Sequence, residues 1–128
     1  MVGVRPSPLE GTITSALTSA WPGRWFGTRI PARERPAEFA RITRTGGDRS
    51  NLVQEQPAVL VECYALTNVA AERFAGDVWS TVAGLAEAVE WIHRVELTMP
   101  VNFPDPDTTT HTRYQFLASI TANLEFTT

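Results

Sequence analysis

A chain of 128 residues has the length of one ordinary domain, and it can bury a hydrophobic core without disulfides or metals. Its formal charge of −3 argues against a free-standing nucleic-acid-binding protein, which usually carries a basic excess. No apolar run approaches the roughly 20 residues of a membrane-spanning helix, and the first ten residues lack the apolar stretch of a signal peptide. We therefore expect a single domain over 1–128, made in the cytoplasm and without a membrane partner.

The chain opens with the signals of a helix start. Ser7 is placed to cap the helix, Pro8 fits its first turn, and Glu10 stands where a capping box needs an acidic residue. Apolar residues then recur at helical spacing, which predicts a helix over 8–20. Residues 1–6 precede these signals and are expected to be flexible.

Three β-prone segments follow, at 25–30, 39–45 and 58–65. The last of them is the most apolar and is expected to lie in the middle of a sheet. Gly46-Gly47 ends the second strand, because paired glycines favour a turn. We therefore predict that 46–56 is a mobile polar loop.

The second half of the chain carries its clearest helix. A cap at Thr67 or Asn68 is followed by one continuous apolar stripe that reaches Val89. We expect the helix to pack this stripe against the sheet. The larger members of the stripe are Phe74, Val78, Val82 and Leu85.

Two further strands are predicted at 94–98 and 113–124, with a loop rich in Pro and Asp at 99–111 between them. In the second strand apolar and polar residues alternate, and Leu117 is the single apolar residue on the polar face. The order α-β-β-β-α-β-β predicts an α+β fold, with a single mixed sheet of about five strands and two helices packed on it. One face or edge of such a sheet needs cover, which neighbouring subunits can supply.

Glu62 is the charged residue inside the apolar segment 58–65. Because it alternates with Val61 and Cys63, strand periodicity puts Glu62 on the outward face of the sheet. The alternative is a buried acid with a raised pKa, as active sites use. Cys63 is expected to be an inert core thiol.

The sequence contains no recognisable catalytic, cofactor-binding or metal-binding pattern. Cys63, His93 and His111 lack the spacing of a zinc site. Asp105 and Asp107 suggest a cation site, but a calcium loop needs more oxygen ligands at set spacing, so a stiff and solvated acidic loop is the simpler interpretation. Neither histidine accompanies a nucleophile motif, and we therefore expect no enzyme activity, no metal and no cofactor.

Several segments of the chain form an ordered pattern. The strand Phe39 to Thr45 with Gly46-Gly47 is followed by the polar loop, the strand Val59 to Ala65 and an alanine-rich helix. A loop with Pro104-Asp105-Pro106 and a closing strand that begins Arg113-Tyr114-Gln115-Phe116 complete it. In this order and spacing, over about residues 8–126, the chain resembles the tail terminator (tail-completion) proteins of long-tailed bacteriophages, especially versions from phages or prophages of GC-rich bacteria.

The resemblance implies a structural protein of the virion that forms a ring, commonly of six copies, at the head-proximal end of the tail tube. The ring stops tube growth and provides the surface that joins the head. Its partners are then other copies of itself, the tail tube protein and the head–tail connector protein, with DNA only as passing cargo. A subunit with a radius of gyration of ~14 Å leaves a central hole about one subunit wide, and a negative chain lets DNA pass without sticking.

An interface in such a ring joins two different patches of the subunit. The candidate patches are the acidic loop 99–111 and an arginine-bearing stretch before the second strand, and the loop 46–56 is a further candidate contact. Two alternatives stay open: another neck or head–tail connector component, and a small oligomeric binding module unrelated to phage. The candidate interface residues are Arg29, Arg33, Arg35, Arg49, Asp105 and Asp107.

Overall fold

The computed structural model describes residues 3–127 and has an α+β fold. Its main sheet is mixed, because one strand pair is parallel and the others are antiparallel. The strands of this sheet are β2 (Trp25–Gly27), β3 (Phe39–Arg49), β4 (Gln54–Ala65), β5 (Ile92–Leu97), β6 (Val101–Asn102) and β7 (Thr112–Asn123). Their order across the sheet is β2-β3-β4-β7-β5, and β6 also pairs with β7. The apolar strand β4 therefore lies in the middle of the sheet, as predicted.

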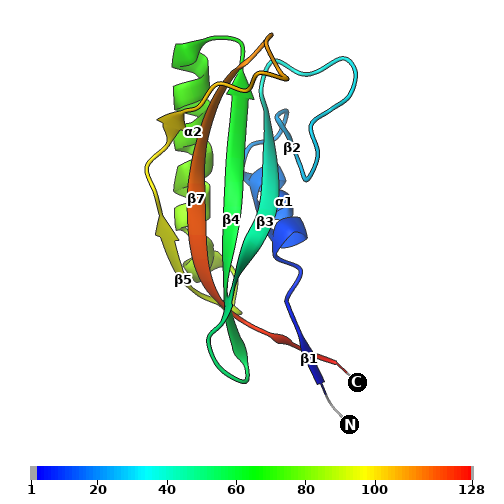
Figure 1. The fold of residues 1–128 in the computed structure, drawn as a ribbon, viewed down its shortest axis with the longest axis vertical. Coiled ribbons are helices and arrows are strands. Elements are labelled where there is room, and N and C mark those ends of the chain that lie inside the picture. The colour runs from blue at the N-terminus through cyan, green and yellow to red at the C-terminus, as the bar shows by residue number, and fades with distance from the viewer. Residues whose placement is uncertain (1–2, 128) are drawn as a thin grey trace.

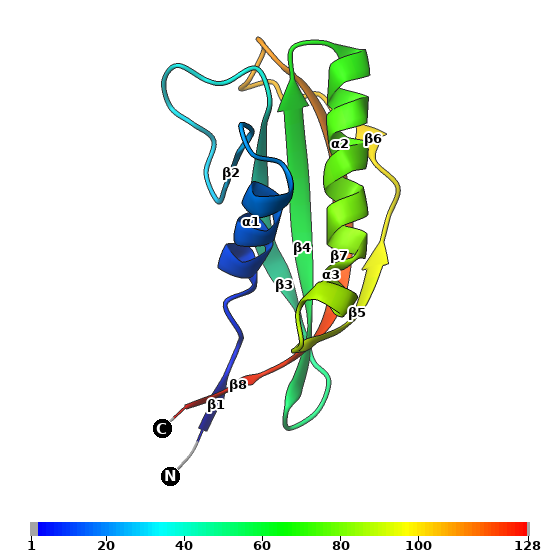
Figure 2. The ribbon, with the colours of Figure 1, turned by 180° about the vertical axis from the view of Figure 1, so that it is seen from behind.

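The helices cover one face of the sheet and leave the other open (Figures 1 and 2). They are α1 (Leu9–Ala20), α2 (Asn68–Ala83) and the single turn α3 (Leu85–Ala88). Helix α2 lies along β4 and β7, and α1 lies against β2 and β3. Among residues 3–127, no helix is both long enough and apolar enough to cross a membrane.

The apolar stripe of α2 packs into the core, which confirms the prediction from its helical spacing. Its large apolar residues are at most 1% exposed. Thr67 caps the helix, since its hydroxyl accepts a hydrogen bond from the Ala70 amide at 3.1 Å. The predicted single helix 67–89 is wrong at its end, because Gly84 separates α2 from α3.

The predicted capping box at the start of α1 is also wrong. Pro8 stands at the cap position, and no side chain caps the helix. The Ser7 hydroxyl donates instead to the Asn123 carbonyl at 2.6 Å, and the Glu10 carboxylate accepts from the Arg44 amide at 2.6 Å. These side chains therefore anchor the start of the chain to the sheet rather than cap the helix.

A long β-hairpin replaces the mobile loop predicted for 46–56. Gly46 and Gly47 have φ angles of 124° and 113°, and the register shift between Arg44 and Gly46 marks a bulge inside β3 rather than its end. Glycine permits these angles because it tolerates positive φ. Beyond the bulge, β3 and β4 pair as far as Arg49 and Glu55, so only 50–53 remain as the turn.

The two ends of the chain form a small ribbon beside this hairpin. Strands β1 (Gly3–Arg5) and β8 (Glu125–Thr127) pair in antiparallel fashion, and the ribbon leaves the body of the domain (Figure 1). Residues 3–5 are therefore paired, which corrects the flexible start expected for 1–6; residues 1 and 2 lie outside the described part. Two further predictions also need correction, since β2 ends at Gly27 rather than residue 30 and the expected loop 99–111 contains β6.

Candidate functional site

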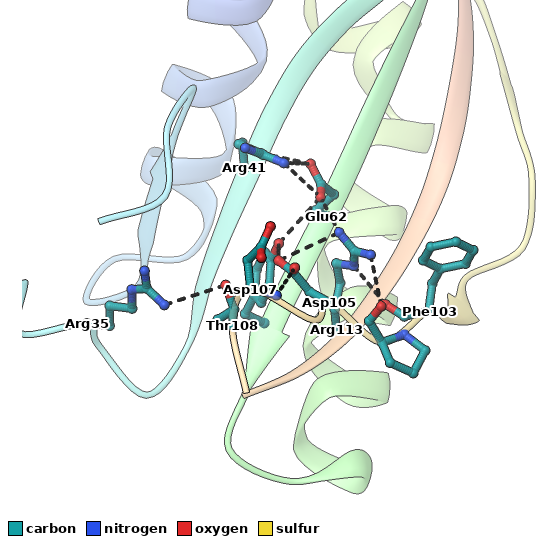
Figure 3. Close-up of polar contacts among 10 residues, drawn as sticks. Arg35, Arg41, Glu62, Phe103, Asp105, Asp107, Thr108 and Arg113 are labelled. Atoms are coloured by element: carbon teal, nitrogen blue, oxygen red, sulfur yellow. Dashed lines mark hydrogen bonds and ion pairs between the residues drawn. The ribbon is translucent and has the colours of Figure 1, made fainter. Parts of the chain in front are cut away.

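Several ionisable side chains contact one another around Glu62 on the open face of the sheet (Figure 3). Its side chain is 1% exposed. The Arg41 guanidinium, from β3, donates to both carboxylate oxygens of Glu62 at 2.8 and 3.0 Å. The Arg113 guanidinium, from β7, donates to Oε2 at 2.8 Å. The central strand therefore carries a buried carboxylate that two neighbouring strands neutralise.

Arg113 extends this cluster to the loop that follows β6. Its guanidinium donates to the Phe103 carbonyl at 2.7 Å and to the Pro104 carbonyl at 3.2 Å. It also lies 5.1 Å from the centroid of the Phe103 ring, within the range of a cation–π contact. Since only 11% of the Arg113 side chain is exposed, this arginine links the loop to the buried Glu62.

Asp105 completes the cluster from the same loop. Its Oδ2 accepts a hydrogen bond from the Tyr64 hydroxyl at 2.8 Å, and its Oδ1 accepts from the Asp107 amide at 2.9 Å. Burial alone would raise the pKa of Asp105, but the hydrogen bonds from Asp107, Tyr64 and Thr108 and the charge of Arg113 outweigh it and hold that pKa below its ordinary value. The pKa of the Tyr64 hydroxyl is raised, chiefly by burial and also by its bond to Asp105.

The cluster corrects the expectations for Glu62 and Asp105. Strand periodicity placed Glu62 on the correct face, opposite Val61 and Cys63, but the side chain is buried rather than exposed. Asp105 is likewise mostly buried and hydrogen-bonded, whereas Asp107 is exposed, as a solvated loop requires. Both oxygens of Glu62 are bonded to arginines of its own chain. Arg113 of β7 and Tyr64 of β4 bond the 103–108 loop directly, and Glu62 connects them to Arg41 of β3, so the cluster fastens the loop to the sheet.

A second arginine–glutamate network lies nearer the other end of the sheet. Arg44 donates to the Glu55 carboxylate at 2.6 Å and to the Ser7 carbonyl at 2.8 Å, and Glu55 also accepts from the Ser7 amide at 3.0 Å. Glu55 is only 6% exposed. Arg44 bonds two acceptors at once through its two terminal nitrogens, as the planar fork of a guanidinium permits.

The candidate interface residues fall into two groups in the structure. Arg29, Arg33 and Arg35 are exposed in the segment between β2 and β3, and that segment adjoins the loop with Asp105 and Asp107. Arg35 even donates to the Thr108 hydroxyl of its own chain at 3.5 Å.

Arg49 lies far from this group, at the end of the β3–β4 hairpin (Figure 1). Its guanidinium donates to the carbonyls of Asn51 and Leu52 at 3.0 and 2.8 Å, which closes the hairpin turn. The structure therefore places the acidic and basic patches side by side within one chain and assigns Arg49 a contact within its own turn.

Exposed apolar side chains are the surface feature that the sequence reasoning did not use. Leu117 is 45% exposed on the open face, and Leu52 is 79% exposed at the hairpin turn. Signals for both were visible, because Leu117 interrupts a polar face and Leu52 stands in a polar segment. Other large apolar residues that are exposed among 3–127 are Val53, Leu66, Val69, Met99, Val101, Phe103 and Phe126.

The cysteine and the acidic residues do not form a metal site within the described range. Over 3–127 no three His, Cys, Asp or Glu side chains come together as metal ligands do. Cys63 is fully buried, and this burial, with the charge of Glu62 as a smaller cause, raises the pKa of its thiol. A thiol with a raised pKa is a weak nucleophile, in keeping with a core residue.

Comparison with protein-family models finds no match to this chain, and comparison with curated proteins finds none either.

Proposed function

We propose that this chain is a tail terminator subunit: a structural, non-catalytic protein that assembles with its own copies into a ring on the head-proximal end of a phage tail tube. One observation carries the proposal beside the sequence resemblance. Helices cover only one face of the sheet, and the open face carries exposed apolar residues, among them Leu117 and Val101. Such surfaces mark sites where another protein binds.

The amount of exposed surface supports assembly. The chain exposes 7442 Å², whereas a compact monomer of 14.1 kDa exposes about 6,700 Å². The hairpin and the β1–β8 ribbon project from the body of the domain (Figures 1 and 2). A two-stranded ribbon is marginally stable alone, so projections of this kind gain stability when a neighbour packs on them.

The polar groups support a structural role as well. The carboxylates of Glu62 and Asp105 are bonded to arginine, tyrosine and backbone groups of their own chain, so they serve to hold the loop in place. The strand segments of the resemblance form β3, β4 and β7, which are neighbours in one sheet. Its alanine-rich helix forms α2, which packs on β4 and β7.

Deletion of the gene in its phage or prophage tests the proposal. Without the protein, we expect tails of irregular length that fail to join heads, and the wild-type gene supplied in trans should restore both features. The measurement is the tail-length distribution in electron micrographs of the lysate. Tails of normal length joined to full heads, in the absence of the protein, contradict the terminator role.

A further inference from the structure

We draw no further inference here: the strongest candidate, the exposed apolar surface at the β6–β7 edge with the shallow hollow beside Leu117, carries none because nothing in the structure shows what covers it.

Discussion

Replacement of Glu62 by glutamine removes the charge that Arg41 and Arg113 share and leaves the size of the side chain unchanged. Loss of one partner from a buried ion pair costs about 3–5 kcal/mol, because the other charge stays buried without compensation. Here Glu62 is 1% exposed and Arg113 is 11% exposed, but Arg41 is 34% exposed and can turn to solvent. Arg113 also keeps its two carbonyl acceptors. We therefore expect a loss near the lower end of the range, about 3 kcal/mol in the free energy of unfolding.

Urea unfolding at neutral pH measures this loss, and the chain offers a matched control. Glu96 also pairs with an arginine on a strand, at 2.8 Å from Arg94, but these side chains are 53% and 71% exposed. An exposed pair contributes about 0–1 kcal/mol, so Glu96→Gln should be nearly neutral. Hydrogen exchange in 103–108 should also become faster in Glu62→Gln alone. If Glu62→Gln and Glu96→Gln lower the free energy of unfolding equally, burial is not what makes the Glu62 ion pairs stabilising, and the reasoning is refuted.

Three further predictions concern the loop, the bulge and the segment between β2 and β3. The pKa of Asp105 is lowered in the fold, so its charged form stabilises the protein above the unfolded pKa of about 3.9. Asp105→Asn should therefore cost about 2 kcal/mol in the free energy of unfolding at neutral pH, and much less as the pH falls through the folded pKa. A difference in the free energy of unfolding between wild type and variant that stays the same at every pH contradicts this. Gly47→Ala should lower the free energy of unfolding by about 1–3 kcal/mol, since φ is 113° and a methyl group would meet the backbone of the opposite strand. The control is Gly76→Ala in α2, where a methyl group meets open space, and it should be neutral or stabilising in thermal melts. Trypsin should cut first at Arg33 rather than at Arg49, because the side chain and backbone of Arg49 are tied into the hairpin. Mass spectrometry of the first fragments checks the order.

Helical periodicity predicted the core packing well, because it is local information. The spacing of Phe74, Val78 and Val82 alone placed one face of α2 on the sheet, and these residues are fully buried. The hairpin at 46–56 was not predictable in this way. Its polar residues and its two glycines suit a loop and a bulged ribbon equally, and pairing between β3 and β4 decides between them.

In the candidate site too, local patterns in the sequence were informative and long-range contacts were not predictable. Alternation predicted the face on which Glu62 lies, but its burial depends on Arg113, which is 51 residues further along the chain. A pattern within one strand contains no information about such a distant partner. The exposed apolar residues were partly visible, since Leu117 breaks the alternation of its strand, although only the structure shows the hollow beside it.

Growth of tail tubes in the presence of this protein tests the central claim most directly. Purified tube protein is polymerised with increasing amounts of the chain, and electron micrographs give the length of each tube and the appearance of its ends. The account predicts shorter tubes as the amount rises, each with a ring at one end. Tubes of unchanged length with bare ends contradict it.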